Sequence, residues 1–306
     1  MERRALKIAT KRFLFQLGFF IMFNAAFLGL PLLPVFLPVL ECFAMPNKTV
    51  LCNFGILQRN LSFAWIVSPA LPLASIAMFL IIGATLGRAM CGWACPLGFS
   101  QDIMASGVRF FKKRQKEFSQ KLHLTLTSVK YMVLLASLAI VISVGATYLI
   151  SWLSGKRYAF SLGVCGQAPY CVICPVPVLF GTLPSLFGAL FSGAPLPQLP
   201  FTFYIGLSAL IFFVGASIIT RRFWCRYLCP LGALMSFFNR FSLLHIKKKE
   251  DKCTAFCRGH QKDCSKNCPM GMQVSRNQDP SSSPECIFCY ECAESCSNKA
   301  VKCKLG

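Results

Sequence analysis

The feature that most restricts this chain is a run of eight cysteines between residues 253 and 296. Their spacing reads C-x3-C-x6-C-x3-C-P and then, after a polar spacer, C-x2-C-x2-C-x3-C. Cysteine runs of this type hold iron–sulfur cubes, in which each corner iron takes one thiolate ligand. A short C-x2-C-x2-C turn wraps three corners, so a fourth thiolate has to come from elsewhere in the chain. The eight cysteines are Cys253, Cys257, Cys264, Cys268, Cys286, Cys289, Cys292 and Cys296.

In two-cluster ferredoxins the fourth cysteine of each run ligates the cluster of the other run. This rule predicts two ligand sets for the tail. One [4Fe-4S] cluster takes Cys286, Cys289, Cys292 and Cys268, and the other takes Cys253, Cys257, Cys264 and Cys296. The second run has the cysteine spacing of bacterial ferredoxins, whereas the cysteines of the first run lie further apart in sequence. Structural zinc and disulfides are the alternatives, and Pro269 directly after Cys268 favours the ferredoxin interpretation.

The composition of the whole chain is typical of a membrane protein. Of its 306 residues, 55% are hydrophobic and 14% are charged, and the mean hydropathy is positive. The formal net charge of +21 would suit a nucleic-acid partner, but the basic residues flank apolar segments or lie in the cysteine-rich tail. Membrane topology explains that placement. We therefore expect a lipid membrane as partner and no nucleic acid.

Four apolar segments reach the ~20 residues that cross a bilayer. They cover residues 13–40, 63–87, 129–153 and 201–220. Residues 176–200 are also apolar, but five prolines interrupt them, which predicts a re-entrant or interfacial hairpin packed against protein. The first segment is too long for the core of a signal peptide, so we interpret it as an uncleaved helix. The predicted fold class is an α-helical integral membrane protein with about four transmembrane helices, this hairpin and a C-terminal ferredoxin-like domain.

An internal repeat restricts the topology. Residues 88–98 and 222–232 both read R-x2-C-x3-C-P-L-G, and each copy follows an apolar segment. Both copies should face the same side of the membrane, which four spans satisfy. Basic residues flank both copies, and residues 109–122 are also basic, so that side is expected to be the cytoplasm. The sequence thus predicts a multi-pass protein of a bacterial-type inner membrane with both termini in the cytoplasm.

The order of residues in the C-x3-C-P motif predicts where its thiols lie and what they can bind. Proline suits the first turn of a helix, so the cysteines before it should lie at a helix N-terminus, where the dipole favours the thiolate. Two ligands from each copy make four, which predicts a third iron–sulfur cluster at the cytoplasmic face. A buried or redox-active dithiol in each copy is the alternative. The four residues are Cys91, Cys95, Cys225 and Cys229.

A further group of cysteines is predicted to face the other side of the membrane. Three of them resemble half of a ferredoxin motif, and the loop at residues 41–62 offers two candidates for a fourth ligand. A further metal site and disulfides are both consistent with them. The group consists of Cys165, Cys171 and Cys174, with Cys42 and Cys52 as the candidates. The chain shows no dinucleotide-binding or ATP-binding sequence motif.

The repeated C-x3-C-P after apolar segments, followed by the double ferredoxin tail, resembles the NapH/NosR-like membrane iron–sulfur proteins. These include four-span ferredoxin-type subunits of periplasmic nitrate reductase and methylamine-utilisation systems, and the resemblance covers residues 64–300. It implies electron transfer between the quinol pool and a partner redox protein, such as a cytochrome, a ferredoxin or a reductase subunit. The family's cluster ligands carry onto the four repeat cysteines and the eight tail cysteines. The stretched first run and the group around Cys165 depart from the family pattern.

The sequence therefore predicts a transmembrane domain at residues 1–245 and a cytoplasmic ferredoxin-like domain at residues 246–306. The leading hypothesis is a membrane-bound electron-transfer protein, with a quinol dehydrogenase or an electron-transfer subunit of an oxidoreductase complex as its enzymatic form. A cofactor-maturation factor that reduces a metal or a disulfide is the second hypothesis. A redox-sensing regulatory module is the third.

Overall fold

The computed structural model describes most of the chain and divides it into two compact units. Unit 1 comprises residues 1–21, 80–131 and 217–306, and unit 2 comprises residues 22–79 and 132–216. Unit 1 contains both copies of the repeat together with the tail, and the predicted domain boundary after residue 245 stays a prediction. The described residues are 2–24, 35–37, 39–40, 50–59, 70–111, 115, 117–154, 169–193, 199, 201–249, 264, 267–272, 279–296 and 300–305.

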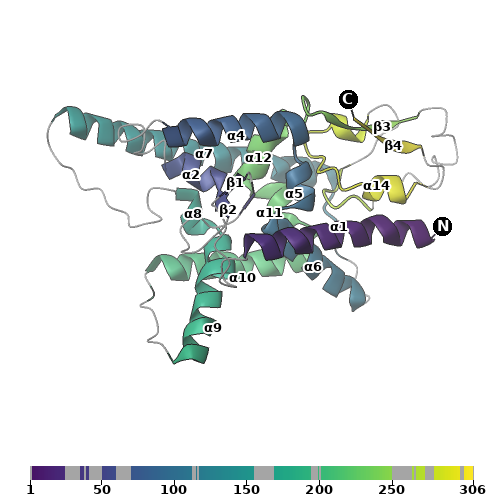
Figure 1. The fold of residues 1–306 in the computed structure, drawn as a ribbon, viewed down its shortest axis with the longest axis horizontal. Coiled ribbons are helices and arrows are strands. Elements are labelled where there is room, and N and C mark those ends of the chain that lie inside the picture. The colour runs from purple at the N-terminus through teal and green to yellow at the C-terminus, as the bar shows by residue number, and fades with distance from the viewer. Residues whose placement is uncertain are drawn as a thin grey trace. The chain divides into compact units, whose positions relative to one another are not determined.

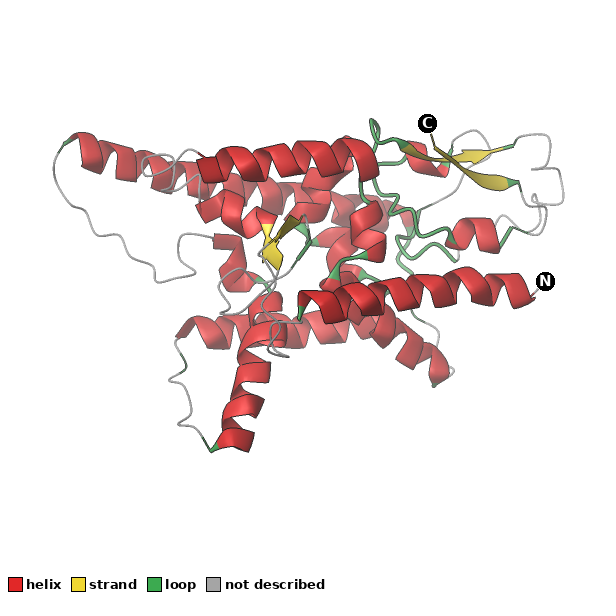
Figure 2. Cartoon of the chain, viewed as in Figure 1, coloured by secondary structure: helices red, strands yellow, loops and turns green. Residues whose placement is uncertain are grey.

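The described part of the chain is mostly helical, with two short pairs of strands (Figure 2). In chain order the elements are α1 Glu2–Phe23, β1 Val35–Leu37, β2 Val50–Cys52, α2 Asn53–Arg59, α4 Ala70–Leu86, α5 Ala89–Trp93, α6 Pro96–Phe110, α7 Gln120–Leu153, α8 Pro169–Ile173, η3 Val178–Thr182, α9 Leu183–Ser192, α10 Phe201–Ile219, α11 Phe223–Tyr227, α12 Pro230–Phe238, β3 Leu244–Lys248, η5 Pro280–Ser282, α14 Glu291–Glu294 and β4 Val301–Leu305.

Two of the described helical segments are long and apolar enough to cross a membrane. They are Gln120–Thr147 within α7 and Phe201–Ile219, which is α10. Both overlap predicted spans. Two shorter apolar helices, Leu73–Leu86 and Val178–Ser192, lie in the second predicted span and in the predicted hairpin. The structure supports a membrane protein, and the full count of four spans stays a prediction.

The predicted hairpin region forms a continuous helical segment within its described part. The π-helix η3 leads directly into α9, which ends at Gly193 with a left-handed φ of 66°. Pro184 in the first turn of α9 explains the widened turn before it, because its ring clashes with the carbonyl group one turn earlier and it donates no backbone hydrogen bond. The described residues thus give a helix at 178–192, and the predicted hairpin is not confirmed. A re-entrant position in the membrane stays a prediction.

The first predicted span also differs from expectation. Helix α1 begins at Glu2, before the apolar run, and residues 35–37 form strand β1, which pairs in parallel with β2 in unit 2. The described residues of this region therefore do not form one helix across 13–40. Two polar side chains hold the first half of α1 against α6. Arg12 and Gln16 are buried, and both donate a hydrogen bond to Asp102 of α6.

Both copies of the repeat fold in the same way. In each, the R-x2-C part leads into a short helix, α5 or α11, and the proline opens the next helix, α6 or α12. Cys95 and Cys229 are the N-cap residues of α6 and α12, with extended backbone, and a proline fills the first turn after each. The predicted position of the second cysteine at a helix N-terminus is confirmed.

The arginine of each copy lies against the glycine of the other copy. A Cβ atom built on Gly98 would lie 3.6 Å from Nη2 of Arg222, and one built on Gly232 would lie 3.2 Å from Nη2 of Arg88. Both arginines are almost fully buried. The first and last letters of R-x2-C-x3-C-P-L-G are therefore coupled, because each glycine leaves room for the guanidinium group of the other copy.

A half-buried carboxylate joins α1, α6 and the second copy. Asp102 accepts hydrogen bonds from Arg222, with Nε–Oδ1 at 2.9 Å and Nη2–Oδ2 at 2.6 Å, and it also pairs with Arg12. Gln16 donates to the same carboxylate at 3.1 Å. Burial by itself would raise the pKa of Asp102, but the guanidinium groups of Arg222 and Arg12 outweigh it and hold this pKa well below its ordinary value.

Ion pairs also hold the tail against the repeat. Arg88 pairs with Glu285 at 2.9 Å and donates to the carbonyl oxygen of Pro284 at 3.0 Å, and Lys130 pairs with the same carboxylate. On α14, Glu291 pairs with Arg221 at 3.1 Å and with Arg12 at 2.7 Å. Both acids lie next to predicted ligand cysteines, so these pairs fix the backbone on which the thiols are carried.

Three side chains of the repeat region donate to tail carbonyl groups. Trp93 Nε1 donates to Phe288 at 2.9 Å, and Arg226 Nε donates to Pro269 at 2.8 Å. Asn239, which follows α12, donates to the carbonyl oxygen of Cys286 at 2.8 Å. The tail loop is closed by β3 and β4, which lie side by side as an antiparallel pair with Ile246 opposite Cys303 (Figure 1). The tail and the repeat thus form one packed unit.

In unit 2 the short helices α2 and α8 pack together. The rings of Phe54 and Tyr170 lie 5.8 Å apart, centroid to centroid. The buried Gln58 accepts a hydrogen bond from the backbone of Tyr170 at 3.3 Å. Cys52, the residue before α2, and Cys171 on α8 belong to this unit.

Replacing Gly92 with alanine tests the contact between the repeat and the tail. A Cβ atom at this position would lie 2.3 Å from the carbonyl oxygen of Ile287, so the backbones must separate. We expect Gly92→Ala to destabilise the protein by about 1–3 kcal/mol, the usual cost of overpacking, measured as a lower thermal midpoint in detergent. Gly107→Ala, with no atom within 4 Å of the new Cβ, serves as control and should not lower the midpoint. Equal midpoints for both variants would contradict the contact.

Replacing Asp102 with asparagine tests the buried ion pair. The variant leaves the buried guanidinium group of Arg222 without its carboxylate, which costs about 3–5 kcal/mol, whereas Arg12 keeps its ion pair with Glu291. The depressed pKa of Asp102 also sets the pH dependence. Its stabilisation is complete above the unfolded-state value of about 3.9 and is lost as the pH falls towards the folded-state pKa. Thermal midpoints should therefore differ most at neutral pH and converge in acid. The exposed Glu117 provides the control, Glu117→Gln, for which we expect little change.

Candidate metal centre

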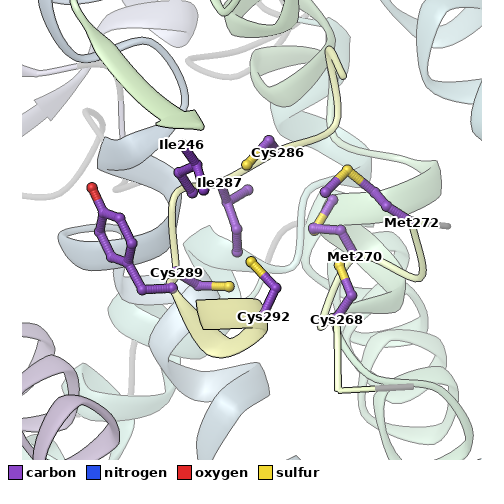
Figure 3. Close-up of a pocket in the computed structure, with 9 residues that line it drawn as sticks. Ile246, Cys268, Met270, Met272, Cys286, Ile287, Cys289 and Cys292 are labelled. Carbon is purple, nitrogen blue, oxygen red and sulfur yellow. The ribbon is translucent and has the colours of Figure 1, made fainter. Parts of the chain in front are cut away.

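A cavity in unit 1 is lined by four of the predicted ligand cysteines. Its empty volume is about 310 Å³ including its opening, and Met270, Met272, Ile246, Ile287 and Tyr290 complete its wall (Figure 3). The four cysteines are Cys268, Cys286, Cys289 and Cys292. They form the first ligand set that the ferredoxin spacing rule predicts, including the thiol that the rule takes from the other run.

The loop before α14 curls so that its two cysteines meet the same cavity as Cys292 on α14. Phe288 and Tyr290 have left-handed φ angles of 51° and 59°. Such angles are uncommon in residues other than glycine, and the hydrogen bond from Trp93 to the Phe288 carbonyl group holds one of the two in place. On the other side of the cavity, Gly271 has a φ of 67° and lies against Arg226, which bonds to the backbone of Cys268 and Pro269.

Burial keeps the cavity thiols protonated when no cation compensates their charge. It raises the pKa of Cys286 to about 12, and it also raises the pKa values of Cys268, Cys289 and Cys292. A thiolate becomes the ligand once a metal ion takes the place of the proton. A dry cavity with four thiols therefore fits a cationic inorganic centre and does not fit a solvated or catalytic thiol.

A zinc ion and an iron–sulfur cube require different distances between their ligand atoms. Within the described ranges, no three cysteine, histidine or acidic side chains converge as the ligands of one metal ion do. A single zinc ion needs four ligands within about 2.3 Å of one point, whereas the thiolates of a cube bind four separate irons.

The repeat cysteines form a second buried group in unit 1. Cys91, Cys95, Cys225 and Cys229 are each at most 8% exposed. Burial raises the pKa of Cys229 well above its ordinary value, and the charges of the other three thiolates add to this shift. The electrostatic interactions show that the two copies bring their cysteines together. The prediction that the helix dipole would favour the thiolate is outweighed here, because desolvation dominates in the protein without metal.

The two groups of thiols share one apolar cluster. Cys91 of the repeat packs in one cluster with Cys268 and Cys289 of the tail. Arg222 lies close enough to Cys225 and Cys289 that the charges of both thiolates raise its pKa, in addition to the larger influence of Asp102. One buried guanidinium group therefore acts on both groups of thiols.

Other predicted site residues are described in part. Cys264 and Cys296 pack against the apolar cluster that contains Cys286 and Cys292. Their predicted partners Cys253 and Cys257 lie outside the described residues, as do Cys42 and Cys165. Cys52, Cys171 and Cys174 are described and belong to unit 2.

Several residues around the thiols were missed by the sequence reasoning. Arg88 and Arg222 stood in the repeat pattern, and their recurrence could have identified them. Gln101, Asp102 and Glu285 had no such signal, because each occurs once and lies beyond the repeated letters. Gln101 Nε2 lies 3.0 Å from the sulfur of Cys225.

Comparison with known proteins agrees with this geometry. The family model described as "4Fe-4S binding domain" matches residues 67–116 and 202–250, which contain the two repeat copies. No solved structure matches the chain.

Three relatives show how far the likeness extends. Protein MJ0750 of Methanocaldococcus jannaschii is 31% identical over 85% of this chain and 88% of its own length. YccM of Escherichia coli, a protein named for electron transport, is 28% identical over 72% of this chain and 52% of its own length. The ferredoxin-type protein NapH of Haemophilus influenzae is 28% identical over 76% of this chain and 68% of its own length. With regulatory proteins named NosR also among its relatives, this chain belongs to the NapH/NosR-like family of ferredoxin-type iron–sulfur proteins.

Proposed function

We propose that this protein passes electrons between the quinol pool and a partner redox protein through three [4Fe-4S] clusters. Four thiols around one cavity, with Cys91 of the repeat in the same apolar cluster as two of them, carry the proposal. A cube with thiolate ligands supplies one-electron redox chemistry. The chain's own part is to hold such centres close together in a dry interior.

The proposed ligand sets follow the predicted spacing. The tail cavity is the site of the cluster held by Cys286, Cys289, Cys292 and Cys268. Cys264 and Cys296, with Cys253 and Cys257, would hold the second tail cluster. The repeat cysteines Cys91, Cys95, Cys225 and Cys229 would hold the third. Burial of all four repeat thiols and their mutual electrostatic interactions support this last set.

Gly92 is proposed to shorten the path between the tail and the repeat. Without a side chain at this position, the backbone of Ile287 approaches α5 directly. Cys91 and Cys289 flank that approach in sequence, and both belong to the same packed cluster. Electron transfer between these two groups of thiols would therefore not require a conformational change.

Buried arginines are proposed to make the site suitable for an anionic centre. Arg88, Arg222 and Arg226 are each at most 2% exposed and lie around the thiols. A cluster with four thiolates carries net negative charge, and nearby fixed positive charge lowers the cost of burying it. The same charges favour the reduced form, which carries one more electron.

We further propose an inner-membrane location with four spans and cytoplasmic termini. The apolar helices Gln120–Thr147 and Phe201–Ile219 support a membrane location. The name of NapH as a ferredoxin-type protein and that of YccM for electron transport support a redox role. Quinol is expected in an apolar groove near the repeat, since lipid-soluble carriers reach the protein from the bilayer.

Metal analysis tests the number of clusters. The anaerobically purified protein should contain about twelve iron atoms and as many labile sulfides per chain, from four per cluster. Cys225→Ser should lower both to about eight. Cys303→Ser, at a thiol outside the proposed ligand sets, is the control and should keep about twelve. Stoichiometric zinc without labile sulfide would overturn the proposal.

Anaerobic addition of a quinol tests the redox partner. Duroquinol should reduce the clusters of the protein in lipid vesicles, seen as new low-temperature EPR signals. In Cys286→Ser, which removes a ligand of the cavity, the signals of the repeat cluster should persist while reduction of an added dye acceptor falls at least tenfold. Clusters that dithionite reduces but no quinol reduces would contradict the quinol part of the proposal.

A further inference from the structure

We infer that Gln101 is a positioning residue that raises the reduction potential of the repeat cluster by donating a hydrogen bond to the sulfur of Cys225. This inference rests on the proposed function, because it assumes a cluster at the repeat cysteines. Gln101 stands on α6 in the first copy, whereas Cys225 lies on α11 in the second. The bond therefore crosses between the two copies.

The contacts of Gln101 fix the direction of this bond. Its Nε2 lies 3.0 Å from Sγ of Cys225, and its Oε1 accepts the backbone N–H of Trp224 at 3.2 Å. A backbone N–H can only donate, so the amide oxygen must face Trp224 and the NH₂ group must face the sulfur. The second hydrogen of Nε2 is directed to the carbonyl oxygen of Leu97 at 3.3 Å. The side chain is fully buried, so these bonds do not compete with water.

The amide donor of Gln101 has no counterpart at the equivalent position of the second copy. Gly98 and Gly232 are the last residues of the two copies, and three residues further on stand Gln101 and Met235. Both side chains are fully buried, and the crossed contacts of Arg88 with Gly232 and of Arg222 with Gly98 show that the copies pack in equivalent ways. Met235 has a thioether, which donates no hydrogen bond. The repeat thus carries an amide on one side and an apolar group on the matching side.

The sign of the effect follows from charge. Reduction adds one negative charge to the centre, and the N–H dipole aimed at its ligand sulfur stabilises the reduced form more than the oxidised form. Hydrogen bonds to sulfur are among the levers that set cluster potentials, and a low local dielectric strengthens them. Removing the donor should therefore make the cluster harder to reduce.

An EPR-monitored redox titration of Gln101→Met tests the inference. This variant puts into the first copy the residue that the second copy already has, with little change in volume. At the midpoint potential of the wild type, the ratio of reduced to oxidised repeat cluster should fall about tenfold, which is about 59 mV for a one-electron couple. Gln115→Met is the matched control, because Gln115 donates to the backbone at residues 217 and 218. Its midpoint should equal that of the wild type.

A second variant keeps the test independent of any loss of folding. Met235→Gln adds an amide at the equivalent place without removing a contact of Gln101, and it should raise the midpoint. An unchanged midpoint in both variants, with about twelve iron atoms per chain, would overturn the inference. Loss of about four iron atoms from Gln101→Met but not from Met235→Gln would also overturn it, since the amide would then hold the cluster and not tune it. If Cys225→Ser removes no cluster from the protein, the ligand set of the proposed function fails before the question of Gln101 arises.

Discussion

Buried guanidinium groups are the constraint on which the rest of unit 1 depends. Arg12, Arg88, Arg222 and Arg226 are between 0% and 6% exposed, and each is paired with a carboxylate or a carbonyl group. A buried charge without its partner costs several kcal/mol, so the partners have to arrive together. Those partners come from α6, from the loop before α14 and from the segment after Cys268. The same interactions therefore assemble the helices and position the thiols.

The two copies of the motif form the same pair of helices but make different contacts. Gly92 of the first copy corresponds to Arg226 of the second, and both meet the tail. Glycine admits the backbone of Ile287, whereas arginine bonds to the carbonyl group of Pro269. Asp102 likewise corresponds to Ser236, which has no charge to offer Arg88, and the tail supplies Glu285 in its place. The two copies of the motif thus hold the tail through different side chains.

Local patterns predicted much of this architecture. The apolar runs at 129–153 and 201–220 indicated α7 and α10, and proline after cysteine indicated the N-termini of α6 and α12, because these rules depend on neighbouring residues alone. The ferredoxin spacing also named four thiols that line one cavity. The early start of α1 was not predicted, since the burial of Arg12 depends on Asp102 and Glu291 far along the chain. Gln101 was missed for the same reason, because its partner Cys225 is distant in sequence.

The pairing of β3 with β4 has a consequence for biosynthesis. Strand β3 directly follows the repeat, but its partner Val301–Leu305 is the last described element to leave the ribosome. The wall of the tail cavity to which Ile246 contributes is therefore completed only when this last described strand pairs with β3, after every cysteine that lines the cavity has been made.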